Sequence, residues 1–291
     1  MGMQLGHVGI WWSGGWPEEP GELSDLLGRL HSLGYETLWL SGGLDRRFNP
    51  QFERLLAANR LLKVASGIHS IWTLSATETA AQFERLEADH PGRFLLGLGV
   101  SHAPLVDGIG ERYEHPFRRM VDYLDELDTA PFLVAPGRRV LAALGPRMLT
   151  LAAQRAAGAH PYFVPVEHTA QARAVLGPDP VLAPELAVVL EEDPARARQL
   201  ARSYAEGYLA MANYAQNLRR LGYAEEDLTG GGSDRLIDAV VAWGDEAAIA
   251  SRVRAHLDAG ASHVCVQVLN GQMRSFPQAE YELLASALFP L

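Results

Sequence analysis

The chain has very little cysteine and no excess of positive charge. Its 291 residues include one cysteine, Cys265, so no internal disulfide can form. The formal net charge is −10 at pH 7 and no lysine- or arginine-rich run is present, which disfavours nucleic acid and membrane surfaces as partners. The chain also lacks a secretory signal and any apolar run near the ~20 residues that span a bilayer. These absences predict a soluble, cytoplasmic protein that binds a small molecule.

Several catalytic signatures are missing as well. The ten histidines do not have the His-Glu-x-x-His spacing of metal sites and cysteine pairs are absent, so no metal is predicted. No Gly-x-Ser-x-Gly motif occurs, which leaves nucleophilic hydrolysis without support. The segment Gly97-Leu-Gly99-Val-Ser-His102 has two glycines of a dinucleotide fingerprint, but the third is absent and a loop with His115-Pro116 follows. A Rossmann fold is therefore not expected.

The chain does show an alternation of short apolar runs and amphipathic segments. Strands are expected at residues 5–12, 36–40, 63–72, 94–100, 139–144, 162–165, 181–190 and 263–269. Helices are expected at residues 23–33, 52–62, 77–89, 117–127, 147–157, 169–176, 194–221, 236–243, 246–259 and 277–289, and a long loop at 101–116. This alternation fits a closed (β/α)8 TIM barrel, with an insertion after strand seven, better than an open doubly wound sheet. We expect a single domain over residues 1–291.

Candidate functional residues follow the ends of these strands, because a TIM barrel forms its site there. His102 comes just after strand four and His69 lies at the end of strand three. Each is either an acid–base group or a structural histidine. Trp11 and Trp12 end strand one, where one of the two should face inward, and Trp72 ends strand three. They either pack in the core or flank a planar ring in the barrel mouth.

The segment Leu144-Gly145-Pro146-Arg147-Met148 joins strand five to a helix. Glycine ends the strand and proline starts the helix, so free backbone N–H groups and the positive end of the helix dipole point outward. The segment is therefore either a phosphate site or only a tight strand-to-helix turn.

Four segments together resemble the luciferase-like monooxygenase superfamily, and within it the coenzyme F420-dependent oxidoreductases. They are residues 92–102, 144–148, 157–161 and 242–245, and their order along the chain carries the resemblance. It implies a barrel that encloses a flavin or deazaflavin ring at the carboxyl ends of its strands. Hydride then passes to or from the ring, and the cofactor supplies the difficult chemistry.

The resemblance also implies which residues bind the cofactor. Its phosphate would rest on backbone amides at Gly145, Pro146, Arg147 and Met148, although Pro146 has no N–H to donate. Many relatives have a non-proline cis peptide in a bulge of strand three, and Gly67-Ile68 is the matching position. The ring would then lie against a set of residues from strands three and four: Gly67, Ile68, His69, Val100 and Ser101.

This chain departs from the family pattern at two strand ends. Relatives that oxidise sugar phosphates or alcohols carry an acidic residue and a histidine after strand two, and a glutamate after strand four. Here the segments are Ser41-Gly42-Gly43 and Val100-Ser101-His102. His102 is left as the proton donor or acceptor, since its ordinary pKa of ~6.5 is near neutral. Gly42, with Trp12 and Trp72, would border the substrate pocket.

These observations lead to three functional hypotheses. The first is an F420-dependent oxidoreductase that transfers a hydride between a deazaflavin and a small organic substrate. The alternatives are an FMN-dependent luciferase-like monooxygenase and a catalytically silent flavin- or deazaflavin-binding protein. Barrels of this superfamily are commonly homodimers, and an apolar stripe within residues 204–218 would either form such an interface or pack inside the chain: Tyr204, Tyr208, Met211 and Leu218.

Overall fold

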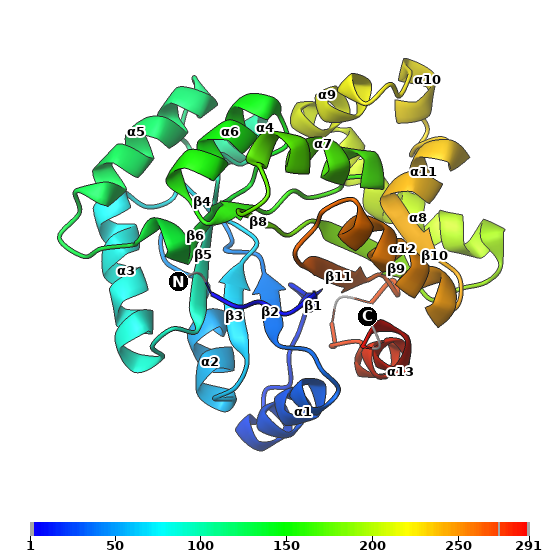
Figure 1. Ribbon diagram of the computed structural model, residues 1–291, viewed down its shortest axis with the longest axis horizontal. Coiled ribbons are helices and arrows are strands. Elements are labelled where there is room, and N and C mark those ends of the chain that lie inside the picture. The colour runs from blue at the N-terminus through cyan, green and yellow to red at the C-terminus, as the bar shows by residue number, and fades with distance from the viewer. Residues whose placement is uncertain (1–2, 273, 290–291) are drawn as a thin grey trace.

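The computed structural model describes residues 3–272 and 274–289. Parallel strands occupy the centre of the molecule and helices surround them (Figure 1). The predicted domain also includes residues 1–2, 273 and 290–291, which lie outside the described residues.

The strands form one parallel sheet that curls into a barrel. In chain order they are β1 (Val8–Trp11), β2 (Thr37–Leu40), β3 (Lys63–Ser66), β4 (His69–Ser70), β5 (Phe94–Gly99), β6 (Arg139–Leu141), β7 (Gly158–Ala159), β8 (Val181–Leu182), β9 (Glu185–Val189), β10 (Val241–Trp243) and β11 (Val264–Val268). Their order in the sheet is β10-β9-β11-β1-β2-β3-β5-β6-β7-β8. β8 pairs with β7 and β9 pairs with β11, and only residues 183–184 separate β8 from β9, so the chain closes the barrel at this point and the predicted TIM-barrel class is confirmed.

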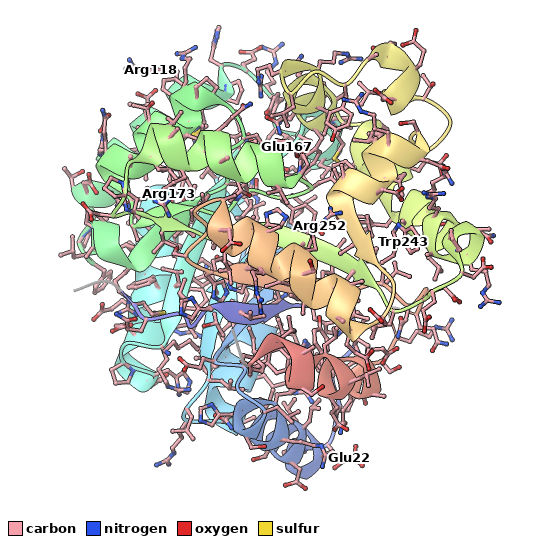
Figure 2. The ribbon with its side chains drawn as sticks, turned by 45° about the vertical axis from the view of Figure 1, so that its right-hand side comes forward. Glu22, Arg118, Glu167, Arg173, Trp243 and Arg252 are labelled. Atoms are coloured by element: carbon pink, nitrogen blue, oxygen red, sulfur yellow. The ribbon has the colours of Figure 1, made fainter. Side chains whose placement is uncertain are left out.

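Most helices form the outer layer. They are α1 (Pro20–Ser32), α2 (Gln51–Ala58), α3 (Ala76–Asp89), α5 (Pro116–Asp128), α6 (Pro146–Arg155), α7 (Val166–Leu176), α12 (Glu246–Asp258) and α13 (Gln278–Leu288). The predicted insertion follows β9 and contains α8 (Pro194–Leu209), α9 (Ala212–Arg220), α10 (Glu225–Leu228) and α11 (Asp234–Val240). Charged side chains such as Glu22 and Arg118 project outward from this layer (Figure 2).

Local sequence explains how these elements form. In α1 the leucines at 23, 26, 27 and 30 repeat at helical spacing and form the buried face. Ser75 and Glu78 form a capping box that starts α3. The strands are continuous apolar runs because helices cover the outer face of the barrel and side chains fill its interior.

Strand six is not where the sequence pattern predicts it. The strand is β7 at Gly158–Ala159, whereas residues 162–165 form the loop that follows it. Gly158 has φ +153 and lies so close to β8 that a Cβ there would be 1.9 Å from the carbonyl oxygen of Val181. Pro161 and Pro165 have no N–H to donate to a neighbouring strand, so the apolar run between them does not pair.

The other differences are local. The predicted helix 236–243 ends at Val240, because Val241–Trp243 pair with Ala187–Val189 of β9 as strand β10. The predicted helix 194–221 is interrupted between α8 and α9, and the predicted loop 101–116 contains a short helix, α4 (Ala103–Gly108). Tertiary pairing decides these cases, which local periodicity cannot.

A bulge separates β3 from β4, and its peptide bond Gly67-Ile68 is cis, as the resemblance predicts. Two glycines of β5 make room for it. A Cβ on Gly99 would lie 2.5 Å from Cδ1 of Ile68, and one on Gly97 would lie 1.9 Å from the carbonyl oxygen of Ser66. The glycines of the segment 92–102 therefore support the bulge.

Within residues 3–272 and 274–289, no helix is long and apolar enough to cross a membrane. The same part of the chain holds no group of three histidine, cysteine or acidic residues arranged to bind a metal ion.

Candidate functional site

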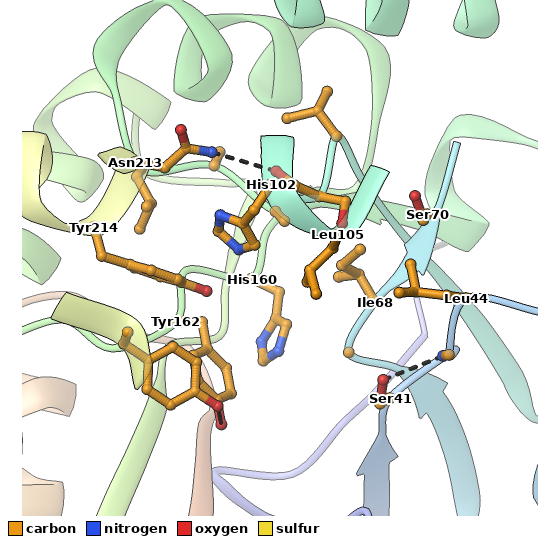
Figure 3. A pocket seen from close by; sticks show the side chains of 18 of the residues that line it. Ser41, Leu44, Ile68, Ser70, His102, Leu105, His160, Tyr162, Asn213 and Tyr214 are labelled. Atoms are coloured by element: carbon orange, nitrogen blue, oxygen red, sulfur yellow. Dashed lines mark hydrogen bonds between the residues drawn. The ribbon is translucent and has the colours of Figure 1, made fainter. Parts of the chain in front are cut away.

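A cavity of about 500 Å³ opens at the carboxyl ends of the barrel strands, where barrel sites form. Leu44 and Ile68 line one side of it, and the aromatic rings of Tyr162 and Tyr214 line the other (Figure 3). This volume lies within the ~300–1,000 Å³ range of small-molecule pockets. The cavity is our candidate site.

Five of the predicted cofactor and acid–base residues line this cavity: Gly67, Ile68, Val100, Ser101 and His102. They come from two neighbouring strands of the barrel and from the residues that follow them, because β4 pairs with β5 directly beyond the bulge. The structure therefore brings together the segments that the sequence placed after strands three and four.

Two predicted residues point away from the cavity because side chains alternate along a strand. Ile68 and Ser70 line the cavity, so His69 between them faces outward and its ring lies 5.0 Å from that of Phe48. Burial lowers the pKa of His69 to about 4, so it is a neutral core residue. In β1, Trp11 lines the cavity, whereas the next residue, Trp12, is fully buried elsewhere.

Trp72 and Gly42 also lie outside the lining, but both support it. Trp72 Nε1 donates a hydrogen bond to the carbonyl oxygen of Val100 at 2.8 Å. The N–H of Gly42 donates to the carbonyl oxygen of Ile68 at 3.0 Å, which fixes the bulge. These contacts position the backbone of the wall rather than border the substrate space.

One residue of the predicted phosphate segment 145–148, Pro146, borders a second cavity of about 310 Å³ at the N-terminus of α6, whereas Gly145, Arg147 and Met148 are not part of its lining. Leu144 lines both cavities, so the second adjoins the first. Pro146 lines it, and Arg220 reaches within 3.4 Å of the position of a Cβ on Gly145. Arg147 instead stacks 4.1 Å from the ring of Phe117, and Met148 packs against the hydrophobic core.

Polar groups from three elements meet in this second cavity. Arg220 Nη2 donates to Oδ1 of Asn217 at 3.1 Å. Asn217 is 2% exposed, and its Nδ2 has no partner in the described part of the chain. His168 Nε2 donates to the carbonyl oxygen of Leu144 at 2.8 Å. Burial and then the charge of Arg220 lower the pKa of His168. With the helix N-terminus, the donors of Arg220 and Asn217 suit an anion such as phosphate.

His102 is the titratable group of the first cavity that follows strand four. It caps the start of α4, and its ring lies 5.0 Å from that of Tyr214. Nδ1 of His102 is buried and has no hydrogen-bond partner among the described residues. Burial lowers its pKa below the ordinary value of 6.5, so the imidazole is neutral at pH 7 and can accept a proton.

Several lining residues escaped the sequence analysis. His160 and Tyr162 follow β7, the strand whose position was wrongly predicted, although the segment 157–161 was part of the resemblance. Tyr208, Asn213 and Tyr214 belong to the insertion, which lies over the cavity. Aromatic residues at helical spacing were the available signal for this segment.

Contacts inside the chain account for the apolar stripe of the insertion. Tyr204, Tyr208, Met211 and Leu218 all pack with the cluster around Phe163. Tyr208 OH donates to Tyr162 OH at 3.0 Å. A homodimer stays a prediction.

The chain matches the family model of the luciferase-like monooxygenases over residues 3–263. It belongs to this family. Members of the family are oxidoreductases and monooxygenases, which supports the prediction that this protein is an enzyme. The comparison with curated proteins found no match.

Solved structures with the same fold include proteins that use different cofactors. The coenzyme F420-dependent tetrahydromethanopterin reductase from Methanopyrus kandleri has a TM-score of 0.76 at 15% identity, with 99% of each chain covered. An F420-dependent secondary alcohol dehydrogenase with an F420-acetone adduct has a TM-score of 0.72 at 12% identity, covering 98% of this chain and 99% of the other. The FMN-bound oxygenating constituent of 3,6-diketocamphane monooxygenase from Pseudomonas putida has a TM-score of 0.62 at 16% identity, covering 100% and 99%.

Proposed function

We propose that this luciferase-like barrel is an F420-dependent oxidoreductase that acts on a small organic substrate. The observation that carries this proposal is the pair of adjoining cavities. One is wide and mostly apolar beside the cis bulge, and the other is rich in hydrogen-bond donors at the N-terminus of α6. A cofactor with a planar ring and an anionic tail would match this pair, with the ring in the apolar cavity and the tail in the donor-rich one.

The residues of both cavities fit such a cofactor. Leu44, Ile68 and Leu105 offer apolar surface to the ring. Asn217 and Arg220 offer donors to the phosphate, and the unpartnered Nδ2 of Asn217 is a buried group that needs an acceptor. A bound deazaflavin would supply the hydride donor or acceptor.

The chain itself would position the reactants and move the proton. His102 exchanges a proton at Nδ1 with the substrate, since this nitrogen is free of other partners. Tyr208 and Tyr214 lie over the cavity and restrict the access of water to it. Asn213 Nδ2 donates to the carbonyl oxygen of Ser101 at 3.3 Å and so holds the insertion against the strand-four loop.

The rim of the second cavity favours F420 over FMN. Its outer residues Gln171, Val175 and Arg220 are exposed, so a chain attached to the phosphate can continue into solvent. F420 carries its phosphate as a diester with a further tail, whereas FMN ends in a monoester. An FMN-dependent monooxygenase is the second candidate, supported by the FMN-bound neighbour of the same fold.

Fluorescence titration with F420 and with FMN tests the proposal. We expect saturable binding of F420, about tenfold or more tighter than that of FMN, because the open rim accepts the diester tail. Activity with a panel of alcohols, aldehydes and unsaturated compounds then separates an enzyme from a silent binding protein. Tighter binding of FMN, with oxygen consumption when a reductase is added, would support the second candidate instead.

Arg220→Ala should weaken binding of the phosphate-bearing cofactor by about tenfold, because it removes the cation that faces the start of α6. Binding of 8-hydroxy-5-deazaflavin, the ring without its phosphate, should not change. Arg219→Ala is the matched control, since Arg219 is paired with Glu225 on the surface. Equal weakening of both ligands by Arg220→Ala would place the phosphate elsewhere.

A further inference from the structure

Two buried nitrogens at the bottom of the first cavity have no hydrogen-bond partner among residues 3–272 and 274–289. They are Nε1 of Trp11 and Nε2 of His160. Trp11 is 6% exposed and His160 is 1% exposed, and both residues line the cavity. Buried polar groups are nearly always paired, so this pair of atoms points to something that binds there.

The hydrogen-bonding role of each nitrogen is fixed. Nδ1 of His160 lies 2.7 Å from the carbonyl oxygen of Ala183, and a carbonyl can only accept, so Nδ1 carries the proton. Burial lowers the pKa of His160 to about 4, hence the ring is neutral and Nε2 is an acceptor. The indole N–H of Trp11 can only donate.

The donor and the acceptor face the same place, directly beside the cis bulge. A Cβ on Gly67 would lie 2.6 Å from Nε1 of Trp11 and 2.9 Å from Nε2 of His160. Trp39 stacks on the His160 ring at 4.4 Å, and Tyr162 packs against the edge of Trp11 at 5.3 Å, so neither ring is free to turn away. Both nitrogens therefore lie within 3 Å of one point, so a single ligand group with a donor and an acceptor could contact both.

We propose that Trp11 and His160 bind the imide edge of the cofactor ring. Trp11 Nε1 donates to a ring carbonyl oxygen, and the neighbouring ring N–H donates to Nε2 of His160. This inference rests on the proposed function, because it assumes a flavin-type ring in the cavity. It adds the orientation of that ring: the imide end lies on the floor beside Gly67, and the opposite end points toward the mouth of the barrel.

Binding of 8-hydroxy-5-deazaflavin and of its N3-methyl derivative, which lacks the imide N–H, tests the pair. We expect the wild-type protein to bind the parent ring about tenfold or more tighter than the methylated one. His160→Ala should remove this preference, because the acceptor is lost and space is left for the methyl group. Trp11→Phe should weaken both ligands by a similar factor of about tenfold, since both keep the carbonyl.

Trp12→Phe is the matched control, because the indole of Trp12 donates to Gly15 outside the cavity and its loss should leave both affinities unchanged. If His160→Ala does not fold, the methyl comparison and Trp11→Phe still decide the question. Suppose that the wild-type protein binds both rings equally well and that Trp11→Phe has no effect. Water alone would then occupy the space beside Trp11 and His160, and the proposed ring orientation would be wrong while the proposed function would stand. No binding of any flavin or deazaflavin would overturn the proposed function and this inference together.

Discussion

His102→Ala is expected to lower turnover about a hundredfold or more while changing cofactor affinity by less than about threefold. The side chain lines the cavity after strand four, and its Nδ1 has no partner in the chain that would hold its proton. In the proposed arrangement the cofactor would be bound by other residues: those of the bulge, of the bottom of the first cavity and of the second cavity near α6. Loss of His102 therefore removes a proton-transfer group and leaves the binding surfaces intact.

The pH dependence of turnover checks the same assignment. Burial lowers the pKa of His102, so a reaction that needs the neutral imidazole should lose rate only as the pH falls below 6.5. This acid limb should disappear in His102→Ala. His115→Ala serves as the control, because His115 is exposed and lies outside the lining. Equal losses of turnover and affinity would instead make His102 a binding residue.

The sequence predicted the barrel because the strongest physical signals are local. Apolar runs of strand length alternate with helices whose leucines repeat at helical spacing, and few folds satisfy both patterns at once. The failures occur where local signals are weak. β7 and β8 are two residues long and carry no period, and β10 exists only because β9 offers it an edge.

The site was predicted less completely, for two reasons. A strand end can be located from sequence, but which of two neighbours faces inward depends on the pleat and on the bulge, so Trp11 rather than Trp12 lines the cavity. The other reason is distance along the chain. Arg220 comes from the insertion and meets Gly145 only because α9 folds over the barrel, and nothing in either segment encodes that contact locally.

Glu185→Gln is expected to stabilise the protein at pH 8, by up to about 4 kcal/mol. Glu185 lies in β9 and is 1% exposed, and its carboxyl group accepts hydrogen bonds from Tyr204 OH at 3.2 Å and from the N–H of Phe163 at 3.3 Å. Burial is the main cause that raises its pKa from 4.5 to about 8. A neutral amide has no ionisable group, and its oxygen can accept from the N–H of Phe163 while its NH2 donates to the hydroxyl of Tyr204.

The direction of the effect follows from the two pKa values. The unfolded chain ionises Glu185 above pH 4.5, whereas the folded chain does so only near pH 8, so the wild-type protein loses stability as the pH rises through this window. Urea unfolding at pH 5 and pH 8 measures the free energy of unfolding. Glu185→Gln should be more stable than the wild-type protein at pH 8 and differ little from it at pH 5. Glu191→Gln is the control, because Glu191 is ion-paired with the exposed Arg196 and its replacement should give no gain in stability. An equal gain at both pH values would show that Glu185 is not protonated in the folded state.

Buried histidines have the opposite effect on the pH dependence of stability, because they lower the stability of the folded protein at acid pH. Burial lowers the pKa of His69, His160 and His263 to about 4 each. The unfolded chain takes up protons at these positions below pH 6.5, so folding stability falls as the pH drops from 6.5 toward 4. Because Glu185→Gln leaves this acid limb unchanged and removes the alkaline loss, the pH of maximum stability should move upward in the variant.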